Sequence, residues 1–337
     1  MLTPSLDALD RRLLDEYQTA FPLVERPYAE LATRLSCTEG EVLRRTASLR
    51  ASGLIRRISA IFDSNALGYQ GVLLAFEIPP GRLESVAQKI AQHPGITHHY
   101  QRDHTFNLWS TLTVSPDANL KNTAEELAQS VHPTRWLFLS AIRVFKIGVN
   151  FQMGKVAPIQ TQPDRLPHAT YKNLTNLEQE AVRLLQTDLS IIAEPFRALI
   201  EDAASKNFTP QTLLDRAHTF LDNRIMRRYA AVLGHQAAGY THNLLTAWKV
   251  PESQAEEIGQ RMAAVTGVSH CYQRVPYPPD WPYTHFAMLH ARTENAATKI
   301  VQEILNTTNI HDHAILKTLR EFKKTRMLYF ANVDAIF

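Results

Sequence analysis

The chain has 337 residues, more than one compact core usually contains, so its length indicates two or more domains. Hydrophobic residues make up 45% and charged residues 20% of the chain, which is typical of a folded globular protein and excludes bulk disorder. With 36 Lys and Arg against 33 Asp and Glu, the formal charge of +3 is too small to indicate a nucleic-acid partner without a motif.

The sequence lacks the marks of several protein classes. Cys37 and Cys271 are far apart, which excludes a disulfide scaffold, a zinc ribbon or an iron–sulfur cluster built from this chain alone. No signal peptide, membrane-spanning stretch, GxGxxG motif or P-loop occurs. We therefore expect a cytoplasmic protein with no membrane contact, no organic cofactor and no metal site of its own.

The first 62 residues predict a helical domain. Apolar residues recur at helical spacing in three short runs, the last of which stops at Gly53. The segment Ser36-Cys37-Thr38, followed by acidic residues, predicts a helix N-cap after a turn, so the second and third helices form a helix-turn-helix. The extended apolar run Leu54–Phe62 then has the length of a strand or wing.

A second unit follows this helical domain. Its predicted elements are strand, helix, strand, strand, helix and strand, at Val72–Ile78, Leu83–Gln92, Ile96–Arg102, Phe106–Val114, Ala118–Val131 and Arg135–Ile147. This βαββαβ order is that of the ferredoxin-like fold. A proline-containing stretch without periodicity at 154–171 then predicts a linker.

Beyond the linker the first half of the sequence returns. Gly95–Arg102 matches Gly267–Arg274, and Arg143–Lys146 matches Arg320–Lys323. We therefore expect an α+β fold that is a tandem duplication of a winged helix-turn-helix-like helical domain plus a ferredoxin-like domain. The expected units are the helical and ferredoxin-like domains of copy one, the linker, a degenerate helical domain and the second ferredoxin-like domain, at 1–62, 63–153, 154–171, 172–232 and 233–337.

The two helical segments differ from a DNA-binding pair. The reading helix of copy one opens with Glu39 and Glu41, which would face phosphates with like charge, although arginines follow. In copy two, Ala193–Phe196 and Asn207–Pro210 interrupt the helical pattern. We expect no specific DNA binding and a helical domain retained for packing or dimer contacts.

One motif occurs in both halves. On a strand, alternate residues share a face, so His98, Tyr100 and Arg102 project together, and their counterparts do the same at His270, Tyr272 and Arg274. For a single copy, a solvated strand face with an aromatic residue for cross-strand packing is the better explanation, but repetition through a diverged duplication favours a binding function. With histidines and aromatic residues nearby, this pattern suits a flat, anionic, metal-bearing ligand.

The helical segment of copy one, with the Ala66–Tyr69 sequence after it, resembles the Lrp/AsnC family of regulators. Arg102–Trp109, Pro282–His290 and Phe322–Phe330 are similar to the siroheme decarboxylase branch, in the form that fuses its two subunits. The resemblance covers nearly the whole chain, although Thr284-His285 departs from the Asn-Leu of the family pattern.

The resemblance implies a carbon–carbon lyase. Such an enzyme removes carbon dioxide from the C12 and C18 acetate side chains of siroheme and gives 12,18-didecarboxysiroheme, on the route to heme d1 or to heme. The iron enters with the substrate. The alternative function is a tetrapyrrole-responsive Lrp/AsnC-type regulator that binds DNA through residues 6–57. The duplication implies an internal pseudo-dimer, with a larger homo-oligomer or related subunits left open.

Decarboxylation leaves an electron pair that a proton must take up, so a general acid is required. His104 and His290 are the candidates, and either one is alternatively an axial ligand of the siroheme iron. Guanidinium, ammonium and aromatic groups suit a carboxylate-rich macrocycle. The expected substrate-binding residues are His98, Tyr100, Arg102, Trp109, Lys146, His270, Tyr272, Arg274, Phe286 and Lys323.

Overall fold

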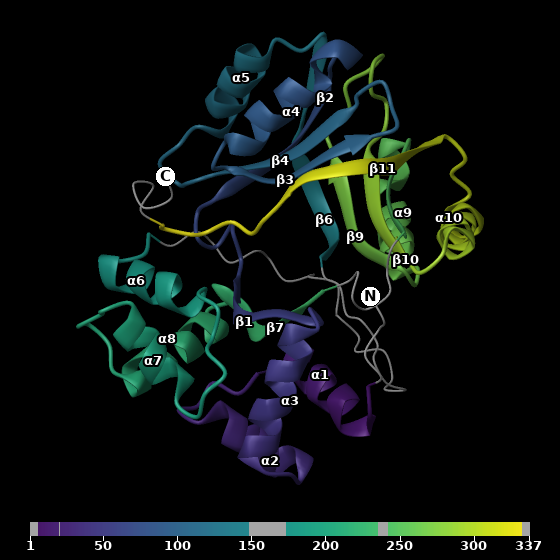
Figure 1. The fold of residues 1–337 in the computed structure, drawn as a ribbon. Helices are drawn as coiled ribbons and strands as arrows, with labels where there is room; N and C mark the ends of the chain where they lie inside the picture. The colour runs from purple at the N-terminus through teal and green to yellow at the C-terminus, as the bar shows by residue number, and fades with distance from the viewer. Residues whose placement is uncertain (1–5, 20, 148–172, 235–241, 332–337) are drawn as a thin grey trace.

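The computed structural model describes residues 6–19, 21–147, 173–234 and 242–331, so the predicted linker at 154–171 lies outside the described residues. The described residues form two layers, and both halves of the chain contribute to each layer (Figure 1). One layer is helical and holds a two-stranded ribbon, and the other contains the large sheets with their covering helices.

In the helical layer, copy one supplies three helices and a strand, α1 (Ala8–Thr19), α2 (Pro27–Leu35), α3 (Glu39–Ala51) and β1 (Ile55–Phe62). The predicted cap is confirmed, because the Thr38 side chain accepts a hydrogen bond from the Glu41 backbone N–H at the start of α3. Ser36 ends α2 in the left-handed region at φ 57°. The turn between α2 and α3 is therefore that of the predicted helix-turn-helix.

Copy two supplies the equivalent set, α6 (Asn176–Leu185), α7 (Pro195–Asp202), α8 (Pro210–Asp222) and β7 (Met226–Leu233). The stretches interpreted as interruptions instead begin helices. Pro195 and Pro210 stand in the first helical turn, where the missing N–H has no intrahelical partner to lose. The divergence of copy two has therefore kept its three helices.

The two helical sets share one core and one ribbon. Strands β1 and β7 pair antiparallel, with Ile58 opposite Ala231. The loop after α6 also binds β1, because the Leu189 N–H donates to the Ile58 carbonyl at 2.8 Å and the Asp188 carboxylate accepts from the Ile58 N–H. Buried apolar side chains from both sets form a continuous cluster. The ribbon is thereby fixed within the helical layer, and the sheet layer lies above it (Figure 1).

The sheet layer contains the two βαββαβ units. Copy one forms β2 (Gln70–Glu77), α4 (Leu83–Gln92), β3 (Ile96–Arg102), β4 (Leu108–Val114), α5 (Leu120–Val131), β5 (Arg135–Leu139) and β6 (Ala141–Ile147). Copy two forms β8 (His242–Trp248), α9 (Ala255–Ala264), β9 (Val268–Arg274), β10 (His285–Ala291), α10 (Glu294–Thr308) and β11 (His313–Lys324). Short 3₁₀ turns precede α4 and α9, at Pro80–Arg82 and Glu252–Gln254.

The last strand of each unit differs from the prediction. The single strand expected over 135–147 breaks at Ser140 into β5, which pairs with β2, and β6, which pairs with β9 of copy two. In return, β11 pairs first with β8 of its own copy and then with β3 of copy one. The strand order is β5-β2-β4-β3-β11-β8-β10-β9-β6. Each half therefore completes the sheet of the other, and hydrophobic periodicity does not identify such a partner.

Helices cover the outer faces of these sheets, with α4 and α5 over copy one and α9 and α10 over copy two. The inner faces enclose an aromatic cluster. Trp109 and Trp281 pack edge to face with ring centroids 5.2 Å apart, and Trp281 stacks on Phe286 at 6.0 Å. This packing holds the central strands of the two copies in fixed positions. Among the described residues, no helix is long and apolar enough to cross a membrane.

Candidate active site

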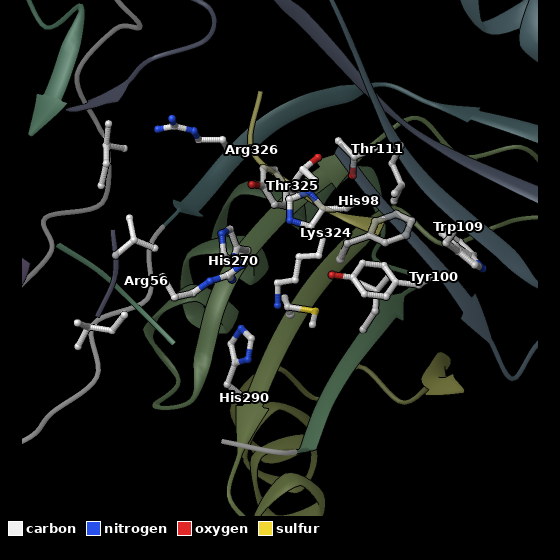
Figure 2. Close-up of a pocket in the computed structure, with 18 of the residues that line it drawn as sticks. Arg56, His98, Tyr100, Trp109, Thr111, His270, His290, Lys324, Thr325 and Arg326 are labelled. Carbon is white, nitrogen blue, oxygen red and sulfur yellow. The ribbon is translucent and has the colours of Figure 1, made fainter. Parts of the chain in front are cut away.

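A cavity of roughly 790 Å³ lies between the two layers. Side chains of β1 and β7 line it from the helical layer, and side chains of β3, β4, β9 and β10 line it from the sheets (Figure 2). The predicted substrate-binding residues that the structure brings together here are His98, Tyr100, Arg102, Trp109, His270, Tyr272, Arg274 and Phe286. Of the two predicted general acids, only His290 lines the cavity.

Two histidines occupy equivalent positions in the cavity. Burial, with smaller contributions from the nearby Lys324 and Arg56, lowers the pKa of His98 to about 4. Burial also lowers the pKa of His270 to about 4, with smaller contributions from His98 and Lys146. Each ring contacts the hydroxyl of the residue before it, at 3.2 Å for Thr97 and 2.9 Å for Ser269. Both imidazoles are therefore neutral at pH 7.

Two arginines are buried at the ends of the same strand motifs. Arg102 lies over the Tyr100 ring at 5.0 Å and Arg274 over the Tyr272 ring at 4.9 Å, both measured to the ring centroid. Arg102 donates to the Leu316 carbonyl, and Arg274 donates to the Leu139 carbonyl. Burial lowers the pKa of each guanidinium to about 10, so both remain charged at neutral pH.

These guanidinium groups retain unused hydrogen-bonding capacity. The Nε atoms of Arg102, Arg274 and Arg228 are buried without a hydrogen-bond partner in the described part of the protein. An unpaired buried donor costs free energy, and a buried charge without a counter-ion costs more. A ligand carboxylate supplies the missing acceptor and the missing charge.

Several cationic residues of the cavity are absent from the sequence-based site. Arg56 and Arg57 project from β1 and Arg228 from β7, while Lys324 and Arg326 come from the end of β11 and the segment after it. The signal for the ribbon arginines was present, since the Arg56-Arg57 pair recurs as Arg227-Arg228 in the repeat. Nothing in the sequence showed that the ribbon lies against the sheets.

Three predicted site residues lie outside the cavity, which corrects their placement. Lys146 donates to the Ala263 carbonyl at 2.9 Å, and Lys323 donates to the Ala91 carbonyl at 2.7 Å. Both ammonium groups thus bind carbonyls at the C-terminal ends of helices, where positive charge is favourable. His104 lies in the β3–β4 turn, accepts from the Phe106 N–H and packs edge to face on Trp281. In the structure its ring therefore packs within this turn and does not face the cavity.

Within the described ranges, no group of three or more His, Cys, Asp or Glu side chains is placed to hold a metal ion. The described lining of the cavity contains six arginines, one lysine and three histidines and no carboxylate. Such a set fits an anionic ligand, and imidazole is a common ligand of heme iron. The aromatic rings beside it offer apolar faces to a planar ligand.

Models of two domain families match the chain. The AsnC-like ligand binding domain matches twice, at residues 66–146 and 237–323, which defines a duplicated AsnC-like protein. The siroheme decarboxylase NirDL-like HTH domain matches residues 10–56. A siroheme decarboxylase from Hydrogenobacter thermophilus is 34% identical over 95% of this chain and 94% of its own length. The chain belongs to the siroheme decarboxylase family.

Solved structures and separate subunits agree with this assignment. The crystal structure of the siroheme decarboxylase NirDL superimposes with a TM-score of 0.76 at 30% identity, covering 96% of this chain and 95% of that one. The same protein has been solved with an iron-uroporphyrin III analogue. In Desulfovibrio desulfuricans the alpha and beta subunits are separate chains. The alpha subunit is 40% identical over 44% of this chain and 85% of its own length. The beta subunit is 37% identical over 45% of this chain and 94% of its own length. Each of these separate subunits thus matches a little under half of this chain.

Proposed function

We propose that this protein removes carbon dioxide from the C12 and C18 acetate side chains of siroheme. The observation that carries the proposal is the cavity, in which cationic side chains surround aromatic faces without a carboxylate in the described lining. The family membership supports the same reaction. The proposed reaction needs no organic cofactor, because the iron arrives with the substrate, and we place it in the cytoplasm.

Arginine and lysine bind the substrate carboxylates in this proposal. Arg102 and Arg274 are buried and held by backbone carbonyls, so their free Nε donors are fixed before the ligand enters. Preorganised donors lose little entropy on binding. Arg57 and Arg228 approach from the ribbon on the opposite side. A macrocycle with carboxylates around its edge thus meets guanidinium groups from both layers.

His290 supplies the proton in this proposal. The bond between the acetate methylene and its carboxylate breaks, carbon dioxide leaves, and the electron pair stays on the methylene carbon next to the pyrrole ring. A proton from the imidazolium then completes the methyl group, and solvent reprotonates the imidazole. His98 and His270 are neutral at pH 7, so they are suited to accept a hydrogen bond or to bind the iron.

We propose that the helical layer closes the cavity and does not read DNA. The arginines that a reading helix would present are already bound within the chain. Arg45 pairs with Asp10 at 2.8 Å and with Glu41, and Arg50 pairs with Asp188 of copy two at 2.9 Å. Specific operator binding at physiological salt would contradict this view and support the regulator.

Anaerobic incubation of the purified chain with siroheme tests the proposed function. We expect product masses that correspond to the loss of one and then two molecules of carbon dioxide, without any added subunit. The matched control is a chain in which Arg102 and Arg274 are both replaced by Ala, which removes the buried guanidinium groups. Unchanged siroheme after binding to the wild-type chain would refute the enzyme.

A further inference from the structure

His290 has a hydrogen-bond partner on the neighbouring strand. In the β8–β10 register Asn243 lies directly opposite His290, so both side chains are on the same face of the sheet. The ring Nδ1 and the Asn243 Oδ1 form a hydrogen bond. His290 lines the cavity (Figure 2), as do Phe286 and Met288, which share its face of β10.

The chemistry of this hydrogen bond determines which ring nitrogen carries a proton. In the amide orientation of the structure the oxygen of Asn243 faces the ring, and because an amide oxygen only accepts hydrogen bonds, Nδ1 donates and keeps its hydrogen in both charge states of the ring. Nε2 is then the nitrogen that gains and loses a proton. A donor that is fixed in this way delivers its proton from one position and in one direction.

The other cavity histidines are held differently. His98 contacts the Thr97 hydroxyl, which donates or accepts and therefore leaves the tautomer open. The Ser269 hydroxyl donates to the Met288 carbonyl and so accepts from Nδ1 of His270, which has a hydroxyl in place of the amide. At the position of copy one that corresponds to the His290–Asn243 pair, Thr113 lies opposite Gly71 in the same register. Copy one thus has neither the imidazole nor the amide at this position.

We propose that Asn243 is a positioning residue that holds His290 in the Nδ1–H tautomer, so that Nε2 donates the proton to the substrate methylene carbon. This inference rests on the proposed decarboxylation for the role of His290. The tautomer itself does not depend on the reaction, and the two ideas are therefore tested separately.

Nuclear magnetic resonance of histidine-labelled apo protein tests the tautomer directly. Long-range ¹H–¹⁵N correlations distinguish the two neutral forms of imidazole, and a His290→Gln variant assigns the signals. We expect the Nδ1–H pattern for His290 in the wild type and in Asn243→Asp, which keeps an acceptor oxygen. In Asn243→Leu the pattern should shift toward the Nε2–H form or a mixture. An Nε2–H pattern in the wild type would overturn the inference.

Steady-state kinetics with siroheme tests the consequence. Asn243→Leu should lower kcat by about 10- to 100-fold with KM changed less than about twofold, because orientation matters more in the transition state than in binding. Asn243→Asp should recover most of kcat. The matched control in copy one is Gly71→Ala, whose added Cβ meets only ordinary contacts at 3.6 Å and should leave kcat unchanged.

The outcomes separate the two proposals. If the wild type is active and Asn243→Leu keeps the wild-type kcat, positioning by Asn243 is wrong while the decarboxylase stands. If the wild type is inactive on siroheme, the decarboxylase fails, and the resonance experiment still decides the tautomer. If thermal unfolding shows that Asn243→Leu does not fold, Asn243→Ser replaces it, since a shorter side chain cannot reach the ring in the same way.

Discussion

The two halves of the cavity match in the repeated His-x-Tyr-x-Arg residues and differ in the residues around them. His98, Tyr100 and Arg102 correspond to His270, Tyr272 and Arg274, and each set makes the same ring contact and the same arginine–tyrosine stacking. Thr113 of copy one instead corresponds to His290 of copy two. The duplication thus preserved the repeated strand motif, while a histidine beside it occurs at this position in copy two and not in copy one.

The cationic groups also break the symmetry. In the repeat, Ile147 corresponds to Lys324, and Lys324 lines the cavity. Arg56 lines the cavity as well, whereas its counterpart Arg227 forms an ion pair with Asp63 at 2.8 Å. Positive charge is therefore concentrated at the end where β11 meets β3. A carboxylate-rich macrocycle has different surroundings at the two ends of this cavity, which favours one orientation of binding.

The largest expected effect is that of replacing His290, which has Thr113 as its counterpart in copy one. His290→Ala should lower kcat by about 10²-fold or more, because general acid catalysis typically contributes 10²–10⁴-fold. Siroheme should still bind with a similar Kd. The control at the equivalent position of copy one, Thr113→Ala, should change kcat by less than about twofold. Single-turnover release of carbon dioxide measures both variants.

Wild-type turnover by His290→Ala would assign the proton to another donor and remove the main functional difference between the halves. A loss of turnover in Thr113→Ala as large as that in His290→Ala would instead point to a shared structural cause. Thermal unfolding of both variants distinguishes that cause from a chemical one.

The second prediction concerns the matched arginines. Arg102→Ala and Arg274→Ala should each weaken siroheme binding by about 1.5–3 kcal/mol, the range for a charge-assisted hydrogen bond. Anaerobic titration followed by absorbance measures this loss. Equal losses indicate that both half-sites hold carboxylates, and a loss confined to one variant indicates that the ligand occupies one end. Unchanged affinity in both variants would show that these arginines are structural.

Most of the fold could be predicted from the sequence. The helix-turn-helix, the Thr38 cap and the βαββαβ order follow from periodicity and capping residues, which are local signals. The exchange of strands β6 and β11 between the copies could not be predicted. It depends on which sheet edge lies nearby, and residues 135–147 have no local signal for a partner.

The site residues that share one strand could be predicted from the sequence, whereas those contributed by different layers could not. Alternation placed the His-x-Tyr-x-Arg residues on one face, and the cavity contains all six of them. Lys146 and Lys323 were expected beside them, but the bulges in β6 and β11 turn these side chains to helix ends. The arginines of the β1–β7 ribbon belong to the helical layer, so their position at the cavity follows only from the tertiary structure.

The third prediction uses the two buried histidines. Their pKa in the folded protein is about 4, below the ordinary 6.5, so the unfolded chain binds more protons as the pH falls below about 6.5. The apo protein should therefore lose stability between pH 7 and pH 5, by about 2 kcal/mol for each histidine. Urea unfolding at both pH values should show a smaller loss in His98→Gln and in His270→Gln. An identical loss in wild type and both variants would contradict the burial of these rings.

The smallest expected effect concerns Lys324, at the end of the cavity where positive charge is concentrated. Lys324→Ile gives copy two the residue that copy one has at Ile147. This substitution should weaken siroheme binding by about 0.5–1 kcal/mol, or two- to fivefold. The effect is small because the Lys324 side chain is partly exposed and pairs with Glu321 at 3.9 Å. The reciprocal variant Ile147→Lys places the charge at the other end. If charge at one end orients the macrocycle, the double variant Lys324→Ile, Ile147→Lys should regain affinity for siroheme. It should also release the singly decarboxylated intermediate with a changed ratio of its two isomers. Chromatography resolves these isomers. A double variant with the isomer ratio of the wild type would show that Lys324 strengthens binding without determining the orientation of the macrocycle. Arg56 and Arg326, which also line the cavity, would then determine that orientation.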